Sequence, residues 1–508
     1  MNAVLDWPVE AADALGTALW TSDDIAAATG GVAVGGAFAA AGCAFDSREV
    51  MEGDLFIALP GESADGHRFV DASFLRGAAG ALVDRTVGFP HVRVANTVDA
   101  LDALGRAARA RLLPDAQVIG VTGSAGKTGV KEALFAALDR SSRGQAHRSV
   151  KSYNNHVGVP LSLARMPARS RFGIFEMGMN HAGELTALTA LVRPHVAVIT
   201  TIAPAHIGHF SSEAAIAQAK TEIFSGLEPG GTAIIPADNI HVELLHTVAR
   251  RHAARVIRFG ADRDADVRLI DAIPNAAGGT LVTAEFTAAT GLARKLCFTV
   301  AQPGMHWVIN SLAVMAAVAA VGGDLGAAGL ALAELADLAG RGARHTIAAE
   351  QGDGSGAALL IDESYNANPA SMSATIASLG ATRARRRLAV LGAMKELGKG
   401  SDAYHADLAA PLIAAGVSHV IMVGAEMASL AHALGKITAS SLAPAIDFVH
   451  VPGAVEAAEL MASGDHMPQG GDAILIKGSN SVGLSALVKA LIQRTTDLEH
   501  GRRVPGDN

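Results

Sequence analysis

Cysteine and aromatic residues are scarce in this chain. Cys43 and Cys297 are the two cysteines among 508 residues, and they lie too far apart for a metal-binding spacing or a disulfide framework. Aromatic residues make up 4% of the chain, whereas hydrophobic residues as a whole make up 50%, which is enough for several cores. This cysteine usage indicates a protein that works in a reducing compartment.

Positive charge and long, strongly apolar runs are scarce as well. The 41 Lys and Arg residues are outnumbered by 49 Asp and Glu residues, and the net charge of −8 disfavours a nucleic-acid-binding protein. Asp6 and Glu10 lie where a secretory signal would carry positive charge. The uncharged stretch 25–45 is rich in Ala and Gly, which makes it a poor membrane span. We therefore expect a cytoplasmic protein that spans no membrane and binds no nucleic acid.

The length and the order of the apolar segments predict three domains. Residues 1–113 mix short strands and helices and predict a small α/β domain. Residues 114–338 alternate apolar strands with helices, as in a parallel sheet covered by helices. Residues 339–495 repeat this alternation and predict a second, doubly wound unit. The remaining residues, 496–508, are polar and are expected to form a tail.

Several elements of the two larger units can be placed individually. An apolar strand at 117–121 precedes a glycine-containing turn and a helix from about 127 to 138. Further helices are expected at 213–227 and at 307–321. The basic run Arg383–Arg387 is expected in the last turn of a helix, where cations suit the helix dipole.

The strongest functional motif lies between that strand and the helix that follows it. Small residues there allow backbone N–H groups and a helix N-terminus to surround phosphate oxygens. Lys127 can reach the β and γ phosphates, and Thr128 can offer its hydroxyl to Mg²⁺. Val121 stands where the generic pattern has Gly, and Gly120 and Gly123 flank it. The motif predicts ATP bound through Thr122, Gly123, Ser124, Ala125, Gly126, Lys127 and Thr128.

This motif resembles the ATP loop of the Mur ligases, which build the peptide of the bacterial cell wall. Asp46-Ser47-Arg48 is similar to the family's nucleotide-sugar-binding segment, and 362–372 resembles the signature of the member that adds a dipeptide. The matches extend from about residue 46 to residue 484. The resemblance implies an α/β protein of three domains. They would be a small N-terminal UDP-binding domain, a central ATPase-like domain with a phosphate loop and a parallel sheet, and a C-terminal Rossmann-like domain.

The resemblance also implies an activity, that of an ATP-dependent amide ligase. Its partners would be UDP-N-acetylmuramoyl-tripeptide and D-alanyl-D-alanine, joined through an acyl phosphate during peptidoglycan synthesis by a monomeric enzyme. A sister ligase that adds the third amino acid, or a folate polyglutamylating ligase, is an alternative, and the segment 364–369 argues against both. A nucleotide-binding regulator is the non-enzymatic alternative.

Glu176 and His206 are candidate metal ligands beside Thr128. Glu176 ends an apolar strand, at the edge where open α/β sheets bind ligands, and Mg²⁺ on ATP needs one or two protein carboxylates. The resemblance implies that Glu176 binds one magnesium ion and His206 a second. His209, three residues further on, leaves a transition-metal pair with His206 open, although no third ligand accompanies them.

Lys220 is an anomaly on its helix, because its helical neighbours Ile216, Ile223 and Phe224 are apolar. Physical chemistry alone favours an amine that snorkels to the surface. The resemblance instead implies a lysine carbamylated by CO₂, which turns a cation into an anion able to hold magnesium. We expect the carbamylated form.

The resemblance implies roles for several further residues. Asn310 would contact adenine, and Arg341 or Arg344 would reach the γ-phosphate. Asp362 or Glu363, at the end of a strand, would hold the ribose or a metal-bound water.

The substrates would be held by polar residues of three segments. The residues that the resemblance implies are Asp46, Ser47, Arg48, Asn154, Asn155, Asn366 and Asn368. The chain departs from the family pattern at Ala393, Lys395 and Asn480, which lie in the domain expected to bring the dipeptide.

Overall fold

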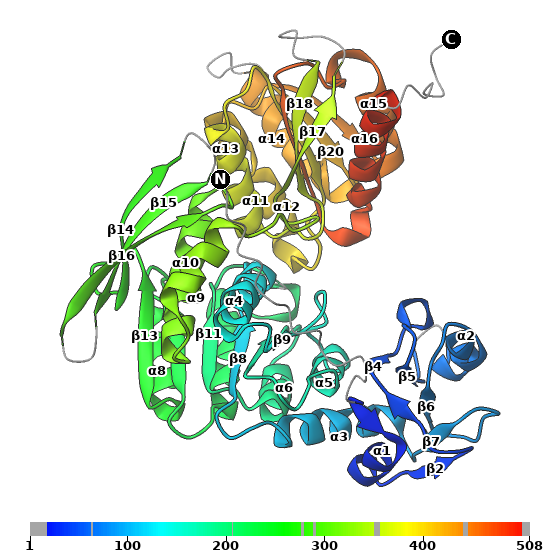
Figure 1. The fold of residues 1–508 in the computed structure, drawn as a ribbon. Helices are drawn as coiled ribbons and strands as arrows, with labels where there is room; N and C mark the ends of the chain where they lie inside the picture. The colour runs from blue at the N-terminus through cyan, green and yellow to red at the C-terminus, as the bar shows by residue number, and fades with distance from the viewer. Residues whose placement is uncertain are drawn as a thin grey trace, which may run out of the picture.

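The computed structural model describes residues 18–61, 64–205, 207–275, 279–287, 291–349, 356–439 and 446–499. These residues form three α/β domains, built around sheets of five, nine and six strands (Figure 1). The predicted fold class is confirmed. Among the described residues, no helix combines the length and the apolar character needed to cross a membrane.

The first domain has a mostly parallel sheet in the order β2-β7-β6-β5-β4, in which β2 alone runs antiparallel to its neighbour. Its elements are β1 (Trp20–Thr21), α1 (Ser22–Thr29), β2 (Val32–Val34), β3 (Ala39–Ala40), β4 (Gly42–Ala44), β5 (Asp54–Ile57), α2 (Val70–Leu75), β6 (Gly80–Val83), β7 (His91–Arg93) and α3 (Thr97–Ala110). Helix α3 leads into the second domain. The Arg109 guanidinium on α3 donates hydrogen bonds to the carbonyls of Val192 and Arg193 and so fixes this helix against it.

The central domain has the sheet order β16-β15-β14-β13-β12-β11-β8-β10-β9. Its strands are β8 (Gln117–Thr122), β9 (Ala146–Arg148), β10 (Phe172–Glu176), β11 (Val196–Ile199), β12 (Thr232–Pro236), β13 (Arg255–Gly260), β14 (Val267–Pro274), β15 (Thr280–Thr287) and β16 (Ala293–Val300). The strands from β9 to β14 pair in parallel, as predicted, whereas β14, β15 and β16 pair antiparallel and extend to one side of the domain (Figure 1).

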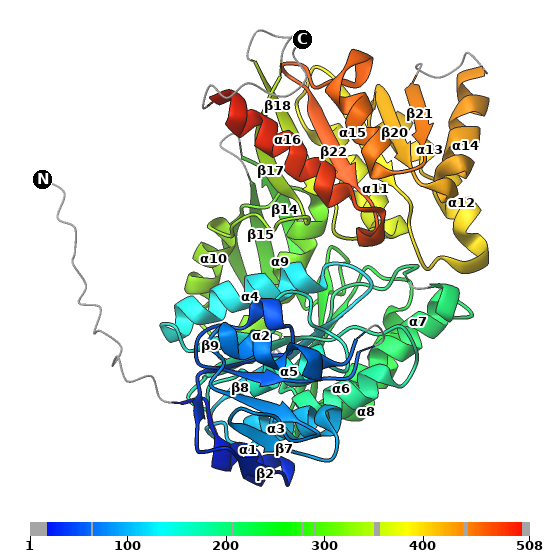
Figure 2. The ribbon, with the colours of Figure 1, turned by 90° about the vertical axis from the view of Figure 1, so that its right-hand side faces the viewer.

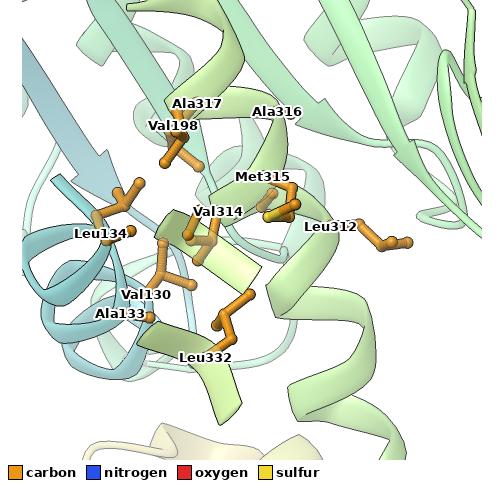
Figure 3. Close-up of a cluster of buried hydrophobic side chains, with 14 of the residues drawn as sticks. Val130, Ala133, Leu134, Val198, Leu312, Val314, Met315, Ala316, Ala317 and Leu332 are labelled. Atoms are coloured by element: carbon orange, nitrogen blue, oxygen red, sulfur yellow. The ribbon is translucent and has the colours of Figure 1, made fainter. Parts of the chain in front are cut away.

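Helices cover both faces of the central sheet. They are α4 (Lys127–Ser142), α5 (Gly158–Ala164), α6 (Glu184–Val192), α7 (Glu213–Lys220), α8 (Val242–His252), α9 (Met305–Ala320) and α10 (Leu325–Ala333). Figure 3 shows α4, α9 and α10 meeting through Val130, Leu134, Val314 and Leu332, all buried. Burying such a side chain contributes roughly 1.5–3 kcal/mol. Helix α9 is apolar on most faces because it packs between these helices and the sheet.

The third domain is a doubly wound unit in the order β17-β18-β22-β19-β20-β21, parallel except for β17. Its strands are β17 (Ala343–Ala348), β18 (Ala357–Glu363), β19 (Arg387–Gly392), β20 (His419–Val423), β21 (Asp447–Val451) and β22 (Ala473–Lys477). Its helices are α11 (Pro369–Ala381), α12 (Ser401–Ala406), α13 (Ala409–Ala414), α14 (Ala428–Ala439), α15 (Ala454–Ala462) and α16 (Leu484–Glu499). Figure 2 shows α16 lying across one face of this sheet, where α15 and α16 share a core with its strands.

The interpretation of the basic run 383–387 was wrong. Helix α11 ends at Ala381 because Thr382 adopts an extended conformation, and Arg387 already begins β19. A cation of this run still meets the end of the helix, because the Arg387 side chain reaches back and donates to the carbonyls of Leu379 and Thr382. The helix predicted at 213–227 is also divided: α7 ends at Lys220, and a 3₁₀ helix continues from Thr221 to Gly226.

Candidate active site

A cavity of about 630 Å³ lies between the central and third domains. Its walls come from the loop between β8 and α4, the first turns of α9, and the segments that follow β18 and β22. The ends of β10, β11 and β12 complete it, so the cavity occupies the carboxyl edge of the central sheet. That edge is where open α/β sheets bind ligands, and this volume suits a nucleotide-sized molecule.

The predicted phosphate loop forms one wall of this cavity and is held in place by its neighbours. The Ser124 N–H donates to the Thr201 carbonyl at 2.8 Å, and the Ser124 hydroxyl donates to the Ala203 carbonyl at 2.8 Å. Gly126 has φ +81°, and a β-carbon there would come within 2.8 Å of Asn310 Nδ2. Asn310 therefore lies directly against the loop, and only glycine fits at position 126. Val121 is buried within β8, upstream of the turn.

Glu176 is a buried carboxylate at the base of the cavity. Its Oε2 accepts a hydrogen bond from the Thr128 hydroxyl at 2.7 Å, and its Oε1 accepts one from the Asn154 amide at 2.7 Å. The structure thus brings together a carboxylate and a hydroxyl at the start of α4. Both are oxygen donors of the kind that Mg²⁺ prefers, so these residues fit a magnesium ion bound together with ATP.

Two lysines are enclosed at this site. Lys220 is only 2% exposed, and burial, together with the charge of Lys127, lowers its pKa well below the ordinary value of 10.5. Burial also lowers the pKa of Lys127, against the opposing effect of Glu176. The Lys127 ammonium donates to the Gly123 carbonyl at 2.8 Å. Because Lys220 lines the cavity from inside, it does not snorkel to the surface, and its environment favours the neutral amine.

The structure separates the two candidate arginines. Arg341 lines the cavity, donates to the Ser152 hydroxyl at 2.9 Å, and lies 4.1 Å from the centre of the Tyr365 ring. Arg344 does not line this cavity, and its guanidinium donates to the Thr382 hydroxyl at 3.4 Å. Of the two arginines, Arg341 is therefore the one that lines the cavity.

The structure also distinguishes the two adjacent carboxylates at the end of β18, Asp362 and Glu363. Asp362 accepts hydrogen bonds from the N–H groups of Gly340 and Ser364 and from the Ser364 hydroxyl, so it stabilises its own loop. Glu363 lines the cavity, and its Oε2 lies 3.3 Å from the Lys477 ammonium. Asn366 and Asn368 also line the cavity, as does Asn154.

Other predicted residues lie elsewhere. Asp46 begins a short 3₁₀ turn in the first domain and pairs with Arg48, whose hydrogen bonds lower the pKa of Asp46 to about 2. Ser47 opens that turn. Asn155 accepts from the Gly158 N–H at the start of α5. None of these four residues lines the cavity described above. His206 lies outside the described residues, and the ring of His209 lies 4.8 Å from that of His181.

Sequence reasoning missed two buried lysines. Lys477 ends an apolar strand and lines the cavity, so it carries the same signal that singled out Glu176. Lys131 is fully buried, and its ammonium donates to the carbonyls of Ser149 and Lys151. The available signal was its position four residues after Lys127, on the same face of the helix.

A phosphate loop beside a buried carboxylate, covered by a second α/β domain, is an arrangement for transferring a phosphoryl group away from water. It defines an ATP-using enzyme that works between two domains.

Comparison with known proteins identifies the family. Residues 121–318 match the model of the Mur ligase middle domain, and residues 344–480 match that of the Mur ligase, glutamate ligase domain. The chain is 33% identical to the UDP-N-acetylmuramoyl-tripeptide–D-alanyl-D-alanine ligase of Synechocystis sp., over 88% of this chain and 91% of the relative. It is 34% identical to the enzyme of that name from Escherichia coli, over 89% and 93%. The chain belongs to the Mur ligase family.

A solved structure agrees with this assignment. The crystal structure of MurF from Acinetobacter baumannii superposes with a TM-score of 0.76 at 28% identity, over 93% of this chain and 99% of that one. The resemblance stated from sequence motifs is therefore confirmed.

Proposed function

We propose that this protein is an ATP-dependent ligase that joins D-alanyl-D-alanine to UDP-N-acetylmuramoyl-tripeptide. The observation that carries the proposal is a single cavity in which the phosphate loop faces the signature segment of the third domain, with Glu363, Asn366 and Asn368 in its wall. Relatives named for this reaction align with about nine-tenths of the chain. The finished product would be the pentapeptide precursor of peptidoglycan.

The first step is phosphoryl transfer to the terminal carboxylate of the tripeptide. A carboxylate oxygen attacks the γ-phosphorus, the bond to the β-bridging oxygen breaks, and ADP leaves. Lys127 and Arg341, which both line the cavity, neutralise charge on the transferred group. Thr128 and Glu176 would hold a magnesium ion, which would supply further charge neutralisation to the phosphates.

The second step is amide formation. The dipeptide amine attacks the acyl carbon, the bond from this carbon to the phosphate oxygen breaks, and the amine loses a proton. Holding the amine beside the acyl phosphate replaces a bimolecular encounter and is worth up to about 7–11 kcal/mol in well-oriented cases. The position of the cavity between two domains limits the access of water, which would otherwise hydrolyse the acyl phosphate.

The remaining predicted roles form part of the proposal. Asn310, against the phosphate loop, contacts adenine, and Lys220 is carbamylated and binds a second magnesium ion together with His206. Asp46, Ser47, Arg48 and Asn155 hold the UDP-sugar end of the substrate. As the family resemblance implies, the enzyme acts as a cytoplasmic monomer.

The test is phosphate release from Mg-ATP with a UDP-muramoyl tripeptide, with and without D-alanyl-D-alanine. We expect release that needs both substrates and an amide product detected by mass. Lys127→Met is the inactive control, with a rate at least about 100-fold lower because it removes charge stabilisation from the transition state. Stimulation by a single diamino acid or by glutamate instead of the dipeptide would assign a sister ligase or a folate ligase. Absence of stimulated release with every acceptor would leave a nucleotide-binding regulator.

A further inference from the structure

Asn368 connects two domains through the two atoms of one side-chain amide. Its Oδ1 accepts a hydrogen bond from the Ser371 N–H at 2.9 Å and so caps α11 in the third domain. Its Nδ2 donates to the Ser124 carbonyl of the phosphate loop at 3.2 Å, although the two residues are 244 positions apart in sequence. The Asn368 side chain is buried, so both hydrogen bonds are shielded from water.

Both ends of this connection are fixed by other contacts. On the α11 side, the Asn368 N–H donates to the Ser371 hydroxyl at 3.0 Å, and Pro369 occupies the first turn of the helix. On the phosphate-loop side, Ser124 is 2% exposed and is tied to the carbonyls of Thr201 and Ala203. Because the two ends belong to different domains, the Asn368–Ser124 hydrogen bond forms only when α11 is docked against the phosphate loop.

The Asn368–Ser124 hydrogen bond also fixes the direction of the Ala125 N–H in the phosphate loop. The peptide unit is planar and trans, so the Ser124 carbonyl and the Ala125 N–H point in opposite directions. Holding the carbonyl toward α11 therefore fixes the direction of the Ala125 N–H within the loop that surrounds the phosphates.

We propose that Asn368 is a positioning residue that couples docking of the third domain to the geometry of the phosphate loop. This role deepens the proposed function, because it makes phosphoryl transfer depend on the domain that brings the dipeptide. Asn368 acts through Ser124 and need not touch the reacting atoms. A residue that only caps α11 would have no such effect.

Two substitutions separate coupling from capping, because Asp and Ser cap helices about as well as Asn does. Asn368→Asp keeps the cap but sets a carboxylate oxygen against the Ser124 carbonyl. Asn368→Ser keeps the cap but is too short to reach the phosphate loop. Asn96 offers matched controls, since its side chain caps α3 through the N–H groups of Val98 and Asp99. Asn96→Asp and Asn96→Ser change a cap of the same kind far from the cavity.

The experiment compares thermal unfolding, small-angle scattering with Mg-ADP, and initial rates for the five full-length proteins. We expect the Asn96 variants to unfold near the temperature of the parent, whereas Asn368→Asp should unfold at a lower temperature because it buries a carboxylate against a carbonyl. Asn368→Asp should show a larger radius of gyration with Mg-ADP and a kcat lower by about 10- to 100-fold, as expected when a reacting group is displaced by about 1 Å. Asn368→Ser should fall between it and the parent.

The proposal is overturned if both Asn368 variants match the Asn96 variants in scattering and in kcat. Scattering with Mg-ADP needs no acceptor, so it tests the coupling even if the dipeptide is not the substrate. Failure of the ligase assay in the parent protein would instead count against the proposed function alone.

Discussion

Lys220 places an amine where a cation is costly. It is buried beside Lys127, and both burial and the neighbouring charge lower its pKa. A neutral amine can add to CO₂, which forms an N–C bond and releases a proton. The resulting carbamate anion would attract the Lys127 cation, whereas a Lys220 ammonium would repel it. The carbamate would also supply an oxygen ligand for magnesium.

Lys220→Met should therefore change both activity and the pH dependence of stability. We expect product formation to fall by at least about 100-fold, as for loss of a group that stabilises transition-state charge. In CO₂-free buffer the folded parent binds fewer protons than the unfolded chain between its lowered Lys220 pKa and 10.5. Its free energy of unfolding gains a contribution that grows with pH across that window and is absent from the variant.

Urea unfolding at several pH values measures this difference. Lys489→Met, on the exposed face of α16, is the matched control and should keep the slope of the parent. Equal slopes for the parent and Lys220→Met would refute the assignment of a strongly perturbed amine at this position.

Some of the site residues could be predicted from local sequence, and others could not. The phosphate loop, Glu176 and Lys220 each have a local signature, either a motif between strand and helix or a polar group among apolar neighbours. The choice between Asp362 and Glu363 has none, because adjacent strand residues point to opposite faces and the sequence does not say which face meets the cavity. The same holds for Arg341, since a partner such as Ser152 lies in another domain.

The loop between β9 and α5 is a single element on which all three domains converge. In the first domain, Glu49 accepts from the Lys151 ammonium and, at 2.8 Å, from the Tyr153 hydroxyl. In the third domain, Arg341 donates to Ser152. The loop then delivers the Asn154 amide to Glu176 at 2.7 Å. Its conformation therefore links the first domain to the predicted magnesium ligand.

Lys131 anchors this loop from beneath, and Lys131→Met tests its importance. The substitution leaves the carbonyls of Ser149 and Lys151 without their buried donor, which costs about 1–3 kcal/mol for each unsatisfied group. We expect a lower free energy of unfolding in urea and a higher magnesium concentration for half-maximal activity. Arg140→Met on the same helix removes a half-exposed cation paired with Glu334 and should cost less than about 1 kcal/mol. A destabilised variant with the magnesium dependence of the parent would show that the loop does not position Glu176.

At this scale the sequence predicts buried strands well and half-exposed ones poorly. The strands β8 and β11 are continuous apolar runs, buried along most of their length, and both were expected. The antiparallel strands β14, β15 and β16 were not, because many of their residues are exposed or half-buried and leave no apolar run to recognise.

In the described part of the chain, several hydrogen bonds join the central and third domains. Two are side-chain contacts, Asn368 with Ser124 and Arg341 with Ser152. A third is between backbones: the Gly208 N–H donates to the Glu396 carbonyl at 2.8 Å. Such contacts pair residues nearly two hundred or more positions apart, so periodicity and motifs in the sequence give no sign of them.

Gly208→Ala tests whether this backbone contact is needed for turnover. A β-carbon on Gly208 would lie 3.0 Å from the Glu396 carbonyl oxygen and 3.1 Å from the Gly398 nitrogen, so the two domains must separate slightly. We expect kcat to fall by only about 2- to 10-fold, since the neighbours must give by a few tenths of an ångström, whereas a shift of about 1 Å costs about 100-fold. The temperature of unfolding should stay near that of Gly88→Ala, a control whose β-carbon meets open space. If Gly208→Ala keeps the parent kcat, catalysis tolerates a looser interface, and domain closure must depend on Asn368 and Arg341 instead.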